Sequence, residues 1–313
     1  ALNASLTFGG MPGLAVDSQD RVYFIDGAVS RVRRINQDGT IHTFAGNGRF
    51  GFTGDGGPAT NTTLNYPSGI YIDDDDQVFI ADYLNHRIRK VDVNGLISTV
   101  INVSTFDFPG SFSPPEIADR VLIGSSTNGD NDNHLDFGPI DLDTSLSGEF
   151  LTRTGGSNAA GPNRLVRISA SGRATRLSGQ GIFAGTGVSP GRIAAAPNGR
   201  VYFTQGGTVR WVDDGGTVQV IAGAQSGSDD DGVSALFADI TPADLLIDPN
   251  NDLIVLDTET DRIRRIDGQG LISTIAGTVN NSGFSGDGGS ATNARLNNPR
   301  AGAYDSRGNL YVH

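Results

Sequence analysis

Residues 66–92 read YPSGIYIDDDDQVFIADYLNHRIRKVD, and residues 241–267 repeat the pattern as TPADLLIDPNNDLIVLDTETDRIRRID. Each copy contains short runs of alternating or wholly apolar residues, which are typical of β-strands, separated by Asp, Asn and Gly as turn formers. One more such run follows each copy, as NGLISTVIN at 94–102 and GQGLISTIAG at 268–277. The repeated unit therefore contains four strands.

Further copies of this unit extend over most of the chain. Four strands in a repeat of about 40–55 residues is the pattern of a β-propeller blade. We therefore predict an all-β protein, a single propeller over residues 1–313 with about six four-stranded blades, of which the last is incomplete. The predicted blades cover residues 7–46, 66–102, 137–179, 188–223, 241–277 and 298–313 (partial), with an insertion at 103–123.

The segments between blades are also repeated. Residues 47–65 read NGRFGFTGDGGPATNTTLN and residues 278–297 read TVNNSGFSGDGGSATNARLN, while residues 224–240 are a variant, AQSGSDDDGVSALFADI. The GDGG motif indicates a tight crossing with positive-φ glycines. The chain starts with ALNASL, which matches the end of such a linker, and stops within the second strand of the sixth copy. We expect a larger protein, or an oligomer or filament in which another chain completes the last blade.

Composition excludes several classes of protein. The net charge of -12 argues against a nucleic-acid partner, because nonspecific binding to nucleic acid requires a basic surface. No apolar run approaches the ~18 residues of a membrane span, so no membrane span is expected. The chain has no cysteine, which excludes disulfides and thiolate metal sites. Glutamate and lysine, which favour exposed helices, number 3 and 1 in the whole chain.

The order of motifs identifies a resemblance. Asn85-His86-Arg87-Ile88-Arg89-Lys90, the ISTV and ISTI strands and the Gly54-Asp55-Gly56-Gly57 linker closely resemble the NHL repeat, as found in bacterial secreted NHL proteins and in the NHL propeller of teneurins. The resemblance covers the chain except for about residues 103–123. It implies a propeller that is one module of a larger extracellular or periplasmic protein and that often serves in binding. The family also includes lyases and RNA binders, so the fold alone does not define the function.

Repeated charged residues have structural interpretations. An aspartate ends the second strand and an arginine opens the third, so we predict hydrogen-bonded pairs within blades. These pairs are Asp26 with Arg31, Asp82 with Arg87, and Asp257 with Arg262. A second set of aspartates ends the first strand, where the carboxylate is expected to accept a backbone N–H two residues on. This set comprises Asp17, Asp73, Asp143, Asp248 and Asp305.

The sequence offers one candidate metal site. Asp130, Asp132 and Asp136 are closely spaced in NGDNDNHLD at 128–136, and hard oxygen ligands suit Ca²⁺. The twelve-residue calcium loop with its terminal Glu is missing, so the alternative is a solvated acidic loop without a cofactor. The acidic runs 73–76 and 229–231 are weaker candidates for attracting cations. Four sequons for N-glycosylation occur, at Asn3, Asn61, Asn102 and Asn280.

No catalytic residues can be assigned from the sequence. The 4 histidines show no metal-ligand spacing, and no GxSxG motif is present. The insertion at 103–123 contains three phenylalanines among prolines, and it either packs on its own propeller or contacts a partner. We expect a noncatalytic extracellular or cell-surface propeller for binding, adhesion or structural assembly, with a protein or glycan partner or self-association. The periplasm is the alternative location. The alternative function is a hydrolase or lyase with a divalent metal in the central channel.

Overall fold

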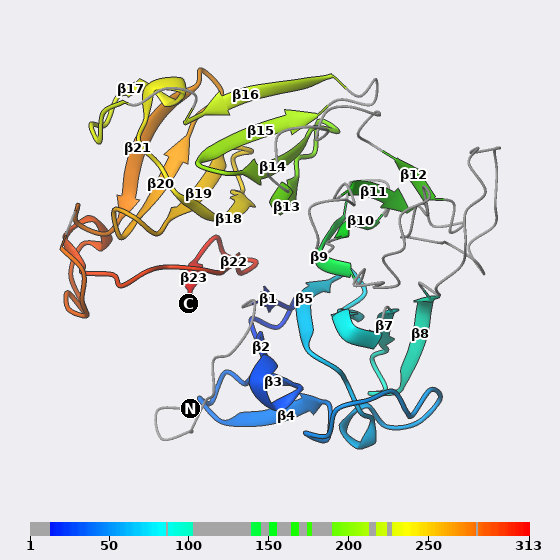
Figure 1. Cartoon of the computed structure of the whole chain (residues 1–313). Helices are drawn as coiled ribbons and strands as arrows, with labels where there is room; N and C mark the ends of the chain where they lie inside the picture. Colours follow the sequence, from blue (N-terminus) through cyan, green and yellow to red (C-terminus); the bar gives the residue numbers. More distant parts are fainter. Residues whose placement is uncertain are drawn as a thin grey trace. The chain divides into compact units, whose positions relative to one another are not determined.

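The structure is a computed structural model of the whole chain. It describes residues 13–85, 87–102, 139–144, 150–154, 164–168, 174–176, 190–212, 217–223, 227–279 and 281–313, and gives only the backbone for residues 101–102 and for the strands between 139 and 190. The chain divides into two compact units, Ala1–Arg176 and Leu177–His313. Each unit is built from antiparallel sheets (Figure 1).

The first unit contains three sheets of four strands each, in which sequence order is spatial order. The first sheet comprises β1 (Leu14–Val16), β2 (Val22–Asp26), β3 (Arg31–Ile35) and β4 (Ile41–Ala45). The second comprises β5 (Pro67–Ile72), β6 (Val78–Asp82), β7 (Arg87–Val91) and β8 (Ile97–Asn102). The third comprises β9 (Pro139–Thr144), β10 (Phe150–Thr154), β11 (Arg164–Ile168) and β12 (Ala174–Arg176).

The second unit contains sheets of four, five and two strands. The four-stranded sheet comprises β13 (Pro190–Ala195), β14 (Val201–Gln205), β15 (Thr208–Val212) and β16 (Val218–Ala222). The five-stranded sheet comprises β18 (Pro242–Ile247), β19 (Leu253–Asp257), β20 (Arg262–Ile266), β21 (Leu271–Ala276) and, beside β21, β17 (Val233–Ser234). The last sheet comprises β22 (Gly302–Tyr304) and β23 (Leu310–Val312).

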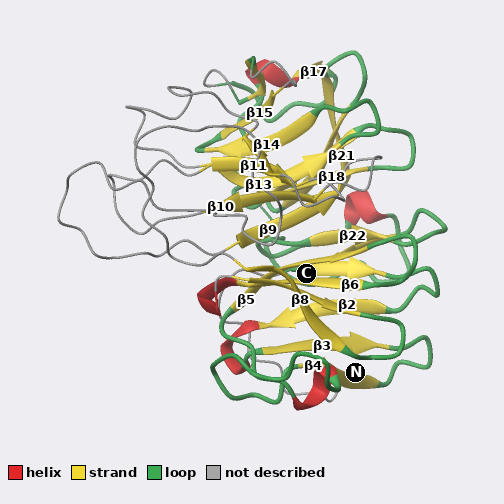
Figure 2. Ribbon diagram, turned by 90° about the vertical axis from the view of Figure 1, so that its right-hand side faces the viewer, coloured by secondary structure: helices red, strands yellow, loops and turns green. Residues whose placement is uncertain are grey.

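The predicted all-β class is confirmed, and strands predominate over a few short helical turns in Figure 2. The expectation of about six four-stranded blades is corrected in detail. Four sheets are four-stranded blades, whereas one has a fifth strand and one has two strands. The fifth strand, β17, comes from the 224–240 linker, whose backbone pairs with β21 at Val233 and Ser234.

Buried apolar side chains hold neighbouring sheets together. In the first unit one cluster joins β2 and β3 with β6, through residues such as Ile25, Val32 and Ile80, and it includes Leu64 from the 47–65 linker. In the second unit a corresponding cluster includes Val209, Val255 and Ile240. Every residue of β6 is buried, because this strand is covered on both faces. Each such aliphatic side chain contributes about 1.5–3 kcal/mol when fully buried.

The predicted aspartate turns are confirmed where side chains are described. In each turn the carboxylate Oδ1 accepts the backbone N–H two residues on and also the N–H four residues on. The four acceptors are Asp17, Asp73, Asp248 and Asp305. The predicted positive φ in the linkers is also confirmed, with values of 90° at Gly54 and 102° at Gly286. A Cβ on Gly54 would lie 2.6 Å from Thr62 Oγ1, which explains the glycine there.

Short 3₁₀ turns occupy the linkers and the connections between second and third strands. They are η1 (Gly27–Val29), η2 (Ala59–Asn61), η3 (Tyr83–Asn85), η5 (Ala235–Phe237) and η6 (Ala291–Asn293). In the described part of the chain, no helix has the length and apolar character needed to span a membrane.

Candidate functional site

The predicted Asp–Arg pairs lie opposite each other on adjacent strands. Asp26 faces Arg31, Asp82 faces Arg87, and Asp257 faces Arg262 in the backbone register. The ion pairs of the first two aspartates run to a different arginine, two positions further along the third strand. Arg89 Nη1 lies 3.4 Å from Asp82 Oδ2, and Arg33 Nη1 lies 4.0 Å from Asp26 Oδ2. For Asp26 and Asp82 the ion-pair partner is therefore this second arginine.

The blade formed by β5–β8 shows the network in full. Asp82 is fully buried, and its carboxylate accepts hydrogen bonds from the Asn65 N–H and from Asn85 Nδ2, both at 2.7 Å. Arg87 Nη1 donates to the Asn85 carbonyl at 2.8 Å, so Asn85 connects the two residues of the predicted pair. Burial raises the pKa of Asp82 to about 6, against the opposing effects of these hydrogen bonds and of the Arg89 charge.

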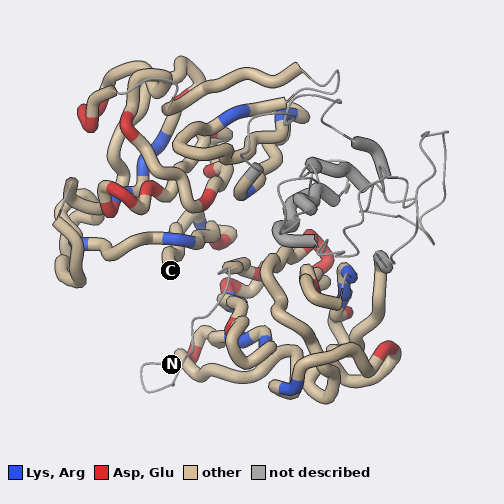
Figure 3. The backbone as a smooth tube through the Cα atoms, in the orientation of Figure 1, with Lys and Arg blue, Asp and Glu red and all other residues tan. Residues whose placement is uncertain are grey.

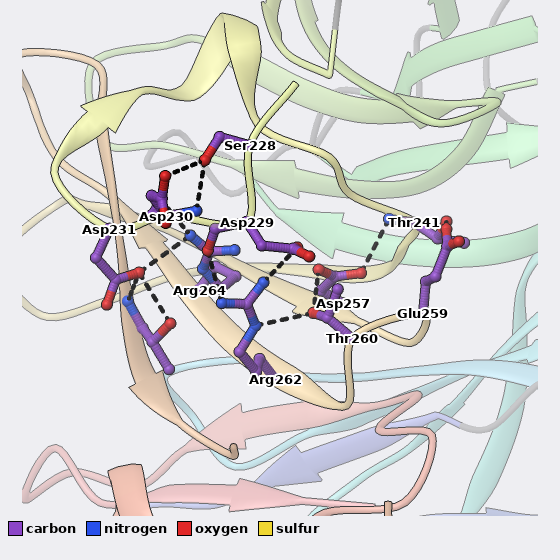
Figure 4. Close-up of polar contacts among 11 residues, drawn as sticks. Ser228, Asp229, Asp230, Asp231, Thr241, Asp257, Glu259, Thr260, Arg262 and Arg264 are labelled. Carbon is purple, nitrogen blue, oxygen red and sulfur yellow. Dashed lines mark hydrogen bonds and ion pairs between the residues drawn. The ribbon is translucent and has the colours of Figure 1, made fainter. Parts of the chain in front are cut away.

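In the blade formed by β18–β21, a threonine takes the connecting position (Figure 4). Thr260 Oγ1 donates to Asp257 Oδ2 at 2.6 Å and accepts from Arg262 Nε at 3.0 Å. The guanidinium of Arg262 then extends to Asp229 Oδ1 at 2.7 Å. In both blades, the polar residue three positions after the strand-end aspartate therefore connects that aspartate to the first arginine of the third strand.

The second arginine of the third strand was missed by the sequence interpretation. Arg89 and Arg264 are fully buried, and both lie among the largest buried side chains of the described residues. The signal was present as Arg-X-Arg, since alternate residues of a strand share one face of the sheet. Burial and the neighbouring Arg262 lower the pKa of Arg264, although three aspartates oppose this effect.

A linker aspartate neutralises each of these buried arginines. Asp55 Oδ1 lies 2.8 Å from Arg89 Nη2, and Asp231 Oδ1 lies 3.1 Å from Arg264 Nη2. The run 229–231, which was a weak cation candidate, therefore supplies counterions to arginines of the chain itself. In the run 73–76, Asp73 closes a turn and Asp76 accepts from Ser18. Figure 3 shows acidic and basic residues interspersed along both units.

One charged pair lies on first strands. Arg192 Nε of β13 lies 3.9 Å from Asp244 Oδ1 of β18, and Asp244 Oδ2 accepts the Gly302 N–H of β22 at 3.0 Å. Asp244 thus joins the first strands of three consecutive sheets in the second unit. Within the described residues, no group of three or more His, Asp or Glu side chains is arranged to hold a metal ion.

Several predicted residues lie outside the described part of the chain. These are Asp130, Asp132 and Asp136 of the candidate calcium site, the sequons at Asn3 and Asn280, and the insertion at 103–123. Asn61 is exposed at the end of η2, and Asn102 ends β8 with its backbone alone described.

Comparisons with known proteins agree with the repeats and the fold. The model of the teneurin NHL domain matches residues 48–115. Teneurin-4 of Homo sapiens and that of Mus musculus are each 28% identical over an alignment of 239 residues, and the match covers 68% of this chain. This chain spans about 8% of the length of either teneurin.

Solved structures with this fold have low sequence identity to the chain, and they are named both as enzymes and as binding proteins. A streptogramin B lyase is 12% identical with a TM-score of 0.56 over 99% of this chain and 92% of its own. A gluconolactonase of Xanthomonas campestris is 12% identical with a TM-score of 0.56 over 98% of this chain and 83% of its own. These likenesses define the class of the chain as a β-propeller. The teneurin matches confirm its resemblance to NHL-repeat propellers.

Proposed function

We propose that this chain is a noncatalytic propeller module of an extracellular or cell-surface protein, which serves in binding, adhesion or structural assembly. The observation that carries the proposal is the match of residues 48–115 to the teneurin NHL domain, together with the teneurin relatives over 68% of the chain. The partner is a protein or a glycan, or a second copy of the chain. The periplasm is the alternative location.

The use of charge within the repeats supports this role. The linker carboxylates Asp55, Asp229 and Asp231 form ion pairs with buried arginines. The repeated charged residues therefore stabilise the fold. Two aromatic residues, Phe50 in the 47–65 linker and Tyr66 directly after it, remain available to a partner. Phe50 and Tyr66 are 54% and 45% exposed, and their rings stack at 5.3 Å between centroids. Aromatic rings of this kind are enriched in protein interfaces.

A binding experiment on intact cells of the source organism tests the proposal. We expect labelled protein to bind saturably, with unlabelled protein as competitor, or to self-associate in sedimentation velocity over a wide concentration range. Protease or glycosidase treatment of the cells separates a protein partner from a glycan. The absence of both saturable binding and self-association would overturn the proposal.

A hydrolase or lyase is the second candidate, favoured by the fold of the structural neighbours and by the Arg192–Asp244 pair on first strands. It predicts turnover of a streptogramin B or of a gluconolactone in the presence of a divalent metal. Activity that Asp244→Asn abolishes, while thermal stability is kept, would favour the enzyme. Equal inactivity of the wild type and the variant would favour the binding module.

Calcium binding at Asp130, Asp132 and Asp136 remains a separate proposal, based on their spacing in the sequence. Calcium should raise the melting temperature of the wild type. A variant with all three residues changed to Asn should lose this shift. An equal shift in both proteins would place any calcium elsewhere.

A further inference from the structure

Four large apolar side chains of the first unit are exposed around the 47–65 linker. Phe50 and Phe52 belong to the linker, Tyr66 directly follows it, and Leu84 lies in η3. Phe52 and Leu84 are 39% and 37% exposed, and the other two rings are more exposed. Exposed apolar patches with polar residues at their rim mark interaction sites. We call these four residues the aromatic patch.

Hydrogen bonds hold η3 against the linker. Asn85 Nδ2 donates to the carbonyl of Gly51, which lies between the two phenylalanines, at 2.7 Å. The N–H of Leu84 donates to the carbonyl of Asn65, directly before Tyr66, at 3.0 Å. Leu84 is therefore held beside the aromatic residues, although it is distant from Phe50 and Phe52 in the sequence.

The backbone of Tyr66 has a conformation that bulky residues rarely adopt. Its φ is 49°, in the left-handed region. Asn298 has the equivalent position before a proline in the 278–297 linker, with a φ of 55°, and asparagine adopts this conformation more readily. The ring of Tyr66 stacks on Phe50 at 5.3 Å between centroids. Asparagine would satisfy the backbone better, so the exposed tyrosine ring indicates a use beyond the fold.

The arginine beside the patch lacks the carboxylate partner of its equivalent in another blade. Arg262, the first arginine of β20, pairs with Asp229 Oδ1 at 2.7 Å. Arg87 has the equivalent position in β7, and the linker residue that corresponds to Asp229 is Thr53. The Arg87 guanidinium lies 3.9 Å from the centroid of the Phe52 ring instead. It forms no ion pair with any residue that the structure describes.

The charge next to the patch is positive, although the whole chain has a net charge of -12. Arg49 directly precedes Phe50, is exposed, and also forms no ion pair within the described residues. The one acidic residue of the segment 47–66 is Asp55, which already pairs with Arg89 at 2.8 Å. The patch therefore combines exposed apolar side chains with arginine charges that the chain itself does not neutralise.

We propose that the aromatic patch, with Arg49 and Arg87 at its rim, binds an acidic segment of a protein partner in which carboxylates stand beside apolar side chains. The apolar side chains pack on Phe50, Tyr66 and Leu84, and the carboxylates pair with the arginines. A protein segment fits better than a glycan, because the hydroxyl groups of a sugar need hydrogen-bonding partners and the exposed patch is apolar. Aromatic residues and arginine are also enriched in protein interfaces. The inference rests on the proposed binding function and names the chemistry of the partner.

The test uses a labelled synthetic peptide, EELEFELEE, titrated with the whole chain in fluorescence anisotropy. We expect saturable binding that weakens as salt is raised, because salt screens exposed ion pairs. Phe50→Ala should weaken binding about three- to tenfold, through loss of an apolar contact. Tyr66→Asn should weaken it to a similar extent and keep the fold, since Asn298 has the same backbone conformation. Arg87→Gln should weaken it about two- to fivefold, through loss of an ion pair.

Matched controls come from the second unit and from altered probes. Phe237 is an exposed phenylalanine of η5, and Arg200 lies over the ring of Trp211 at 4.7 Å. Because neither belongs to the patch, Phe237→Ala and Arg200→Gln should leave peptide binding unchanged. A peptide in which every glutamate becomes glutamine should bind at least about tenfold more weakly, since it loses all its ion pairs. An oligosaccharide of uronic acids tests the patch for an anionic glycan and should not bind.

Three outcomes would overturn the site. The first is failure of the peptide to bind, or equal binding by the glutamine peptide. The second is unchanged peptide binding in both Phe50→Ala and Tyr66→Asn, with melting temperatures equal to that of the wild type. The third is binding of the uronic-acid oligosaccharide in place of the peptide. If cell binding persists in any of these cases, the proposed function stands without this site.

Discussion

Asp55 forms an ion pair at 2.8 Å with Arg89, a fully buried arginine of the blade that follows the Asp55 linker. Arg89 also contacts the buried carboxylate of Asp82 at 3.4 Å. A buried cation requires such partners, because removal of its hydration is costly. The relationship therefore fixes the linker to the blade and explains why aspartate is repeated in the linkers.

Replacement of Arg89 by alanine should lower the free energy of unfolding by about 3–5 kcal/mol, because it leaves Asp82 as an unpaired buried charge. Urea unfolding followed by tryptophan fluorescence or circular dichroism measures the change. The control is Arg49→Ala, since Arg49 is exposed in the same linker and should change stability by less than about 0.5 kcal/mol. Equal losses in the two variants would contradict the role of Arg89.

The buried Asp82 should give the protein a characteristic pH dependence. Its pKa is about 6 in the folded state and about 3.9 when unfolded. Between these values the folded state binds more protons, so the contribution of Asp82 to stability falls as the pH rises from about 4 to about 6. We expect the stability of the wild type relative to Asp82→Asn to fall by about 2–3 kcal/mol across this window.

Asp92 provides a control of opposite sign for this measurement. Backbone and side-chain hydrogen bonds from Leu96 and Asn94 lower the pKa of Asp92. Its contribution is present above the unfolded pKa and is lost as the pH falls. The stability of the wild type relative to Asp92→Asn should therefore decrease on acidification. If the difference in free energy of unfolding between the wild type and Asp82→Asn stays constant between pH 4 and pH 6, the raised pKa of Asp82 is contradicted.

The polar residue that connects the strand-end aspartate to the third strand should also be needed for stability. Thr260→Val removes the donor to Asp257 Oδ2 and the acceptor for Arg262 Nε, while the shape is preserved. A buried acceptor left without its donor costs about 1–3 kcal/mol. Thr258→Val is the matched control, because its hydroxyl contacts the Thr241 carbonyl at an exposed position. A larger loss in the control would refute this assignment.

The sequence predicts those parts of the structure that depend on local pattern. The Asp17 and Asp73 turns follow from the reach of a short carboxylate to its own backbone, which needs no knowledge of the fold. The partner of Asp82 could not be obtained in this way. Arg87 lies opposite Asp82 in the register of the two strands, yet the ion pair of Asp82 is formed with Arg89. Both arginines lie on the same face of β7, and the contact of Arg89 with Asp55 depends on where the linker crosses that face.

The same limit applies to β17 and to Phe52. Val233 and Ser234 form a strand because their linker lies along the edge of β21 and pairs with it. Their own sequence does not indicate a strand. The ring of Phe52 lies 3.9 Å from the guanidinium of Arg87, a contact between two segments that are distant in the sequence. Repetition in sequence locates these positions, whereas contact between distant segments defines their partners.

The glycine that follows the fourth strand should be the most sensitive glycine of the repeat. A Cβ on Gly277 would lie 2.3 Å from the Asp261 carbonyl oxygen, and Gly46 and Gly223 meet Ser30 O and Gly207 O at 2.3 and 2.2 Å. Gly277→Ala should therefore cost about 3–5 kcal/mol, from the left-handed φ and from the clash with backbone. Gly270 has a φ of +79° and open space around an added Cβ, so Gly270→Ala tests the left-handed φ without the clash. It should cost about 1–2 kcal/mol. Urea midpoints with unchanged m-values measure both, and equal costs would show that the close approach to Asp261 is not rigid.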